Sequence, residues 1–244
     1  MSALIWDNTG EKFYETGDKK MVLYVSDVTN PGQYLTGVAW NGITAVSSND
    51  SGAEETALWA DDIKYAVLRS APEYGGTIEA YQCPIEFYQC DGSAVVGDGV
   101  VIGQQGRKTF GISYVTTIGN DVLGTDYGYK IHIVWGCSAS PSERSYQTIN
   151  DSPDAITLSW EFTTTPTPIG SITIDGTATE FKPVSHIVID ASKYITNGEK
   201  DSKLVALEEK LYGRDADATN NITASDPTLP TPAQVIKLML GIND

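Results

Sequence analysis

The stretch AITLSWEFTT, which spans Ala155–Thr164, decides the fold class. Every second side chain in it is apolar, and we assign these four to the core: Ile156, Leu158, Trp160 and Phe162. The side chains between them are threonine, serine and glutamate. A period of two with one apolar and one polar face is typical of an antiparallel strand that covers a core on one side.

The same alternation occurs in two segments that precede this stretch. In Lys108–Thr117 the apolar side chains Phe110 and Ile112 share one face, and polar residues occupy the other. Tyr129–Cys137 repeats the pattern, with Trp135 on its apolar face. Phe110, Ile112 and Trp135 therefore join the predicted core. Less regular patterns predict further strands at Met21–Ser26, Thr77–Gln82, Ser171–Asp175 and Ser185–Asp190.

Helices are expected to be few and short. Asp201 can cap a helix whose leucines fall on one face, and Gly213 can end it. Thr231 begins a second helix with a capping box and a proline at the first helical position, and Gly241 follows it. Pro84 can open a third, shorter helix. Together the elements predict a mainly β protein, a β-sandwich or barrel with flanking short α-helices.

All of these elements are expected to belong to one compact unit. Residues 1–200 form the sandwich with a long loop at 41–62, and residues 201–244 supply C-terminal helices and a tether that pack on the same domain. Asn41–Asp62 is expected to be a loop because it begins with a turn-type Asn-Gly and has a polar, acidic middle. Ala216–Pro232 contains three prolines and is expected to be the tether.

The composition excludes several classes of protein. The 244 residues include 32 acidic and 16 basic ones, which gives a formal net charge of −16. Readers of nucleic acid and binders of anionic membranes need basic stripes, so this charge argues against both. No apolar run approaches the roughly 20 residues of a membrane span, and Met1–Gly10 carries no secretory signal. An odd number of cysteines, three, favours reduced thiols, so we expect a soluble protein made in a cytosol.

No motif predicts a catalytic, cofactor-binding or metal site. The histidines are His132 and His186, without cysteines at metal-ligand spacing, and His132 is expected to be solvated or at an interface. Gly103–Thr109 resembles a phosphate loop faintly but lacks the glycine directly before the lysine. Adjacent carboxylates such as Asp61 and Asp62 are expected on a solvated surface, because 32 acids will place some side by side. We therefore expect no enzyme.

Six longer strings carry a resemblance that covers most of the chain. They are GVAWNGITAVS at Gly37–Ser47, TIEAYQCPIEFYQCD at Thr77–Asp91, IGQQGRKTFGIS at Ile102–Ser113, IGNDVLGTDYGYK at Ile118–Lys130, TINDSPDAITLSWEFTTT at Thr148–Thr165 and KLVALEEKLY at Lys203–Tyr212. In their order and extent they resemble the major tail protein, or tail tube protein, of long-tailed, non-contractile phages of Gram-positive bacteria.

The resemblance implies a structural virion protein with a β-sandwich flanked by a helix. Such proteins form hexameric rings that stack into a tail tube around the tape-measure protein, with the tail terminator and distal tail proteins as further partners. Sheets from six subunits line one lumen, which conducts DNA during ejection without binding it specifically. No cofactor or membrane takes part. The chain is then expected to be made in the host cytoplasm and to end in the phage tail.

The resemblance also suggests a function for the predicted long loop at Asn41–Asp62. Loops of its length are usually functional, so we expect it to reach a neighbouring subunit in the adjacent ring. The expected contact residues are Ser47, Ser48, Asn49, Asp50, Ser51, Gly52, Ala53, Glu54 and Glu55.

Two other functions remain open at this point. One is a monomeric β-sandwich binding module for carbohydrate or a cell surface, with Trp6, Trp40 and Trp59 as an aromatic platform. The other is an acidic hydrolase that uses a pair of carboxylates, whose separation in space no sequence can give.

Overall fold

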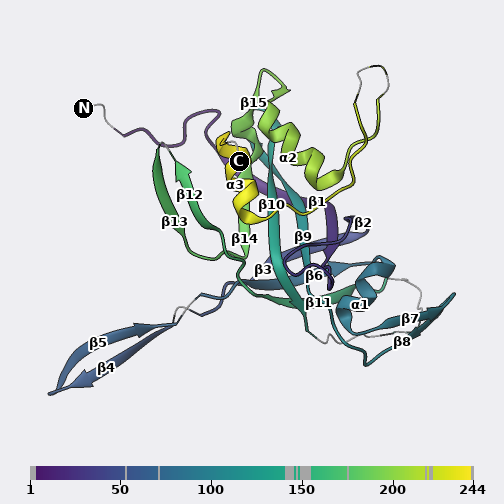
Figure 1. Ribbon diagram of the computed structural model, residues 1–244. Helices are drawn as coiled ribbons and strands as arrows, with labels where there is room; N and C mark the ends of the chain where they lie inside the picture. Colours follow the sequence, from purple (N-terminus) through teal and green to yellow (C-terminus); the bar gives the residue numbers. More distant parts are fainter. Residues whose placement is uncertain are drawn as a thin grey trace.

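The fold is mainly β, a β-sandwich that closes toward a barrel, with flanking short helices (Figure 1), which confirms the predicted fold class. The computed structural model describes residues 4–52, 54–70, 72–140, 146, 148, 155–174, 176–217, 219 and 222–242. The strands are β1 Phe13–Val25, β2 Val38–Trp40, β3 Ile43–Ser48, β4 Glu55–Ala60, β5 Ile63–Arg69, β6 Gly75–Ala80, β7 Ala94–Gly97, β8 Val100–Ile102, β9 Phe110–Asn120, β10 Gly124–Ala139, β11 Leu158–Thr164, β12 Gly170–Ile174, β13 Thr177–Phe181, β14 His186–Asp190, β15 Ile195–Thr196 and β16 Glu199–Lys200. The helices are α1 Tyr88–Asp91, α2 Ser202–Tyr212 and α3 Pro232–Leu240, with 3-10 turns η1 Ile85–Phe87 and η2 Ala191–Tyr194.

Strand β10 organises the main antiparallel sheet, whose order is β2-β1-β9-β10-β11-β6-β3. Besides β9 it has two partners: Lys130–Val134 pair with β14, and Cys137–Ala139 pair with β11. The change of partner falls at Gly136, where the register with β9 shifts and φ is 63°. A Cβ there would lie 2.3 Å from the carbonyl oxygen of Thr165. Only glycine fits this bulge.

Strand β1 has a bend of its own. Its register with β9 shifts between Lys19 and Val22, and Lys20 has a φ of 54°, which is uncommon for a long side chain. After the bend, Met21–Leu23 also pair with β2. The bends of β1 and β10 divide the sheet in two. The upper sheet comprises residues 13–19 of β1, 115–120 of β9, 124–134 of β10 and β14; the lower barrel comprises the remaining strands of the main sheet.

The lower barrel encloses the first hydrophobic core. Strand β3 lies next to β1, where the backbone N–H of Val46 donates a hydrogen bond to the carboxylate of Asp18 over 3.0 Å. Inside, the ring of Trp160 lies 5.5 Å from that of Trp40 and 5.2 Å from that of Phe87. Four predicted core residues are buried here as expected: Phe110, Ile112, Trp160 and Phe162.

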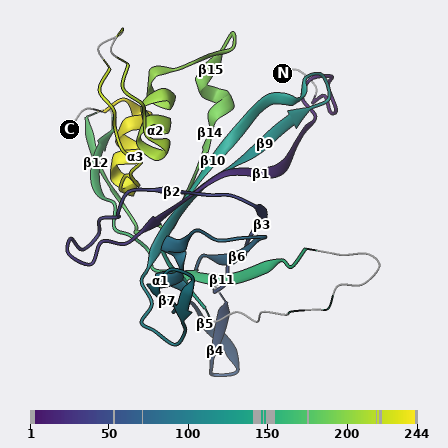
Figure 2. The same ribbon diagram turned by 90° about the vertical axis from the view of Figure 1, so that its right-hand side faces the viewer.

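A second core lies on the other side of β9 and β10, under α2 and α3 (Figure 2). Trp135 is buried in it, as predicted, and its indole N–H donates to the carbonyl oxygen of Pro230 over 2.9 Å. The expectation that these strands keep a solvent-facing polar side is therefore wrong. Ser113 is fully buried there, 3.3 Å from the hydroxyl of Tyr24, which donates to the carbonyl oxygen of Leu211 over 2.6 Å. A polar side chain can lie inside when it has such a partner.

The helix boundaries agree with the sequence-based predictions. Asp201 accepts a hydrogen bond from the backbone of Lys203 over 2.8 Å, and Gly213 follows α2. Thr231 forms both halves of the predicted capping box with Gln234. The expected tether contributes more than a connection. Asp217 and Ile222 form a β-bridge within it, and Leu229 is buried in the second core.

Ile156 corrects the predicted core, whereas Leu158 packs against it. Ile156 precedes β11 and is 42% exposed, so its assignment to the core is wrong. Leu158 begins β11, pairs with Ala80 and is half-buried. Because Ala80 is the last residue of β6, no paired strand within the described residues lies beside Ile156.

The predicted long loop at Asn41–Asp62 is also wrong. It contains β3, which pairs with β6, and β4, which pairs with β5 in a hairpin. The Asn-Gly step joins β2 to β3, and these strands pair with β1 and β6 rather than with each other.

The substitution Trp160→Ala tests the lower core. Trp160 is 2% exposed, so its removal should leave a cavity that lowers the free energy of unfolding by roughly 3–5 kcal/mol in urea denaturation. Trp59→Ala is the matched control: Trp59 is 68% exposed, so its loss should leave stability nearly unchanged. Equal melting temperatures of Trp160→Ala and the parent protein would mean that the faces of β11 are assigned wrongly.

Candidate assembly surface

The upper sheet has two open edges. On one side β14 pairs with β10, and on the other residues 13–19 of β1 pair with β9. No further strand in the described part of the chain pairs with the outer edge of either. Each outer edge presents unpaired N–H and C=O groups, which natural proteins usually cover or block. Because the edges border one sheet on opposite sides, the β14 edge of one copy can pair with the β1 edge of another.

A hairpin arm formed by β4 and β5 projects from the body in both ribbon views (Figures 1 and 2). Its pairing runs from Glu55 with Arg69 to Ala60 with Ile63. Six of its large apolar side chains are exposed: Leu58, Trp59, Ile63, Tyr65, Val67 and Leu68. An isolated two-stranded hairpin is marginally stable in water, and uncovered apolar side chains in such number mark an interaction surface.

Strands β7 and β8 form a second, shorter arm with the same character. They pair from Ala94 with Ile102 to Gly97 with Val100. Their exposed apolar residues are Val95, Val96, Val100, Val101 and Ile102. Both arms therefore present strand surfaces that another protein surface could cover.

The residues predicted to form an inter-subunit loop lie at the base of the β4–β5 arm. Ser47 and Ser48 end β3 and pair with β6. Ser51 forms a bridge with Glu73, and Glu55 begins β4. The positions between them are Asn49, Asp50, Gly52 and Glu54, while Ala53 lies outside the described residues. The projecting residues are thus 56–68, which lie beyond the predicted range.

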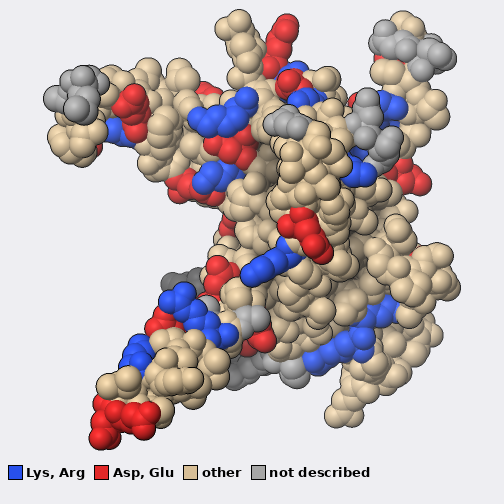
Figure 3. All heavy atoms as spheres, turned by 60° about the vertical axis from the view of Figure 1, so that its left-hand side comes forward, with Lys and Arg blue, Asp and Glu red and all other residues tan. Residues whose placement is uncertain are grey.

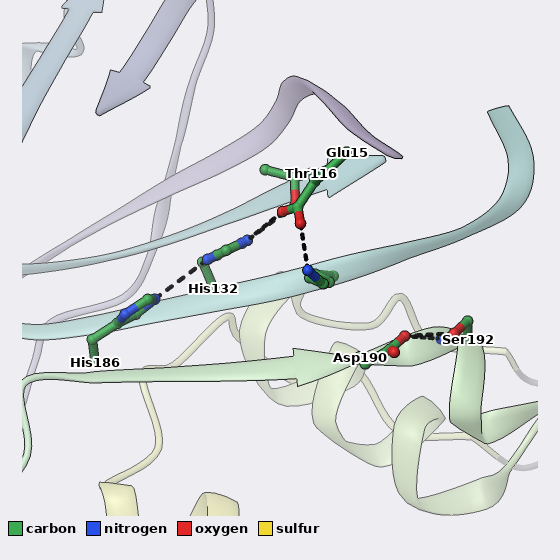
Figure 4. Close-up of polar contacts among 7 residues, drawn as sticks. Glu15, Thr116, His132, His186, Asp190 and Ser192 are labelled. Atoms are coloured by element: carbon green, nitrogen blue, oxygen red, sulfur yellow. Dashed lines mark hydrogen bonds and ion pairs between the residues drawn. The ribbon is translucent and has the colours of Figure 1, made fainter. Parts of the chain in front are cut away.

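A row of polar side chains crosses the upper sheet on the face away from α2 and α3 (Figure 4). The hydroxyl of Thr116 donates to Glu15 Oε1 over 2.5 Å, so Nε2–H of His132 donates to Thr116 Oγ1 over 3.0 Å. Nδ1 of His132 then accepts from Nε2–H of His186 over 3.3 Å. Lys130 forms an ion pair with the other oxygen of Glu15. The row links all four strands of the upper sheet.

Burial keeps the two imidazoles neutral at pH 7. Desolvation lowers the pKa of His132, against the opposing charge of Glu15. Desolvation, with the neighbouring His132, lowers the pKa of His186 to about 4. Each imidazole also stacks on a tyrosine ring at 4.6 Å: His132 on Tyr114, and His186 on Tyr74. His132 was expected to be solvated or at an interface; the first alternative is wrong, since its side chain is only 13% exposed, and the second stays a prediction.

The meeting of the two histidines was not predicted from the sequence. His132 pairs with Val188 across the strands and His186 with Val134, so the imidazoles are diagonal neighbours on one face. Nothing within either segment shows that β14 pairs with β10. The alternation of each strand gives the face of each histidine, but not its partner strand.

Charge is interspersed over the face shown in Figure 3, with acidic side chains at the tip of the projecting arm. Within the described residues, no group of three or more histidines, cysteines, aspartates or glutamates could hold a metal ion. The same residues include no helix that is long and apolar enough to cross a membrane.

The three tryptophans considered for a carbohydrate platform do not form one. Trp40 is buried, and its indole N–H donates to the carbonyl oxygen of Gln82 over 2.8 Å. Trp6 lies in the exposed N-terminal segment, and Trp59 lies next to the turn of the β4–β5 arm. These two segments are far apart in both ribbon views.

Comparison of the sequence with known proteins identifies no family for this chain. No protein-family model matches the chain, and the search of curated proteins finds no match.

The substitution His186→Gln tests the polar row through pH. An unfolded histidine has a pKa near 6.5, whereas that of folded His186 is about 4, so the unfolded chain binds the proton first. The parent protein should therefore lose about 1–3 kcal/mol of stability as pH falls from 6.5 toward 4. His186→Gln should lose less, measured by urea unfolding at both pH values. Parallel losses in the two proteins would show that His186 is not held neutral.

Proposed function

We propose that this chain is a tail tube subunit of a long-tailed phage. It assembles into hexameric rings, and the rings stack into the tube that surrounds the tape-measure protein and later conducts DNA. One observation carries the proposal: a four-stranded sheet with both edges open, in a chain whose strings resemble tail tube proteins. Since a fold by itself implies no function, the argument depends on these edges and on the uncovered arms.

The two open edges of the upper sheet could pair between copies and so form a ring. When β14 of one copy pairs with β1 of the next, the contact joins two different surfaces of the chain. Such head-to-tail contacts close into a ring when the rotation between copies divides a full turn. Closure also removes the exposed edges, which on a lone monomer would promote uncontrolled pairing. In the ring the upper sheets of neighbouring copies form one continuous wall.

The uncovered arms fit contacts between copies. The β4–β5 arm presents Trp59 and Tyr65, which are the kinds of side chain that anchor protein interfaces. Nothing in the described part of the chain packs over them, as their exposure shows. A neighbouring copy that covers the arm would stabilise a hairpin that is marginal alone.

The polar row suits the face of the wall that meets DNA. Lys130 is paired with Glu15, so this face offers little free positive charge to phosphates. The imidazoles beside it are neutral at pH 7, for the reasons given above. With a net charge of −16 on each copy, a phosphate backbone meets weak repulsion and can slide.

Electron microscopy of the purified chain tests the proposal. At high concentration the parent protein should form rings or hollow tubes in negative stain. Replacing residues 55–69 by a short Gly/Ser linker should keep the circular dichroism and melting temperature of the body but abolish tubes, because the arm is lost and the lower barrel is not. Tubes of normal length from this variant would exclude a role of the arm, and a parent protein that stays monomeric and retains a glycan would favour a binding module.

DNA binding gives a separate test. Neither the free nor the assembled protein should bind duplex DNA measurably at physiological salt, because no basic stripe is available to displace counterions. Glu15→Lys leaves Lys130 without its partner and adds a positive charge in every copy, so it should produce salt-sensitive binding to tubes in a filter-binding assay. A salt-sensitive, submicromolar complex with the parent protein would contradict a passive conduit.

A further inference from the structure

A cavity of about 710 Å³ opens at the bend of β1. Its apolar walls include Met21, Trp40 and Ile43, and Tyr212 of α2 borders it. Its rim carries two adjacent basic residues, Lys19 and Lys20, both exposed. We call this cavity the socket.

The charge of the socket is mostly basic. Asp18 also lines it, but its carboxylate already accepts a hydrogen bond from the backbone of Val46 over 3.0 Å. The ammonium of Lys20 lies 5.9 Å from the centre of the Tyr212 ring. Lys20 has a φ of 54°, an uncommon conformation for lysine, which turns the chain at the rim of the socket. In a chain with twice as many acidic as basic residues, such a pair favours an acidic occupant.

The tip of the β4–β5 arm has the complementary chemistry. Ala60 pairs with Ile63, so Asp61 and Asp62 form a two-residue turn, with φ values of 51° and 61°. Turns with both central residues in this region favour Asn-Gly. Here two carboxylates occupy the turn instead, beside the exposed side chains of Trp59 and Ile63. The turn at the tip therefore carries two negative charges, and the strands next to it carry exposed apolar side chains.

We propose that the tip of the β4–β5 arm on one copy of this chain inserts into the socket on a second copy, where Asp61 and Asp62 meet Lys19 and Lys20. Trp59 or Ile63 then lies against the apolar wall of the socket. The arm projects away from β2 and α2, which border the socket, in both ribbon views, so a tip reaches the socket of another copy rather than its own.

The contact joins two different surfaces, and it can repeat from copy to copy without closing. It therefore suits the stacking of one ring on the next. The inference rests on the proposed function, since it assigns a partner site to the arm of the tube subunit. The contact between two copies of the chain can nevertheless be tested without tubes.

Carbodiimide cross-linking tests the contact directly, because this reagent joins a carboxylate to an amine only when the two touch. A mixture of full-length chains with natural and ¹⁵N-labelled nitrogen is treated at millimolar concentration and analysed by mass spectrometry. We expect mixed-isotope cross-links from Asp61 or Asp62 to Lys19 or Lys20. Cross-links of Lys19 and Lys20 to Asp7 of a second copy instead would overturn the inference and give the socket to the N-terminal segment.

Charge exchange tests whether the contact drives assembly. The double variants Asp61→Lys/Asp62→Lys and Lys19→Glu/Lys20→Glu should each lose tubes in negative stain, and the chain that carries all four changes should recover them. Matched charge changes at exposed positions outside both arms and the upper sheet, Glu86→Lys/Glu180→Lys and Lys182→Glu/Lys210→Glu, should leave tubes unchanged. Failure of the fourfold variant to recover tubes would contradict a direct pairing of the four side chains.

A turn-preserving variant excludes misfolding of the arm as the cause. Asp61→Asn/Asp62→Gly gives the turn its preferred residues and removes both carboxylates. It should keep the melting temperature of the parent and still lose the cross-link and the tubes. Normal tubes from this variant, with no cross-link to the lysines in the parent, would reject the socket while leaving the tube function intact. Absence of the chain from tails of the native particle would reject the function instead.

Discussion

The bulge at Gly136 is the constraint on which the rest of the structure depends. It lets one strand, β10, leave β14 and join β11, so that a single strand belongs both to the upper sheet and to the lower barrel. A side chain at this position would collide with the carbonyl oxygen of Thr165. Without the change of partner, β10 could not pair both with β11, which carries Trp160 of the lower core, and with β14, which carries His186 of the polar row.

The division has opposite consequences for the two parts. The lower barrel buries its apolar side chains around Trp160 within one chain, and such burial is the main contribution that favours folding. Helices α2 and α3 cover the upper sheet on one face only, and no strand in the described part of the chain pairs with either of its outer edges. The chain thus buries its cores by itself but leaves the edges of the upper sheet unpaired. This combination supports an assembly subunit over a monomeric module, whose expected tryptophan platform the structure does not form.

The sequence predicts those features that depend on neighbours along the chain. Period two places Trp135 and Trp160 correctly, and the caps at Asp201 and Thr231 give the helix ends, because each signal lies within a few residues. Features that depend on pairing at a distance are missed. Ile156 follows the apolar period but extends past the end of its partner strand, and the β4–β5 arm turns on Asp61-Asp62 instead of a recognisable Asn-Gly. The open edges and the projecting arms, on which the proposed assembly depends, are among the missed features.

Amide hydrogen exchange tests the central claim, that the open edges of the upper sheet pair between copies. It is measured for β14 and for residues 13–19 of β1, first in the monomer and then in the assembled protein. Amides that point away from the partner strand exchange fast when unpaired, and strand pairing slows them. The account predicts fast exchange at both outer edges in the monomer and strong protection of both in the assembly. Fast exchange at either edge in assembled tubes would contradict it.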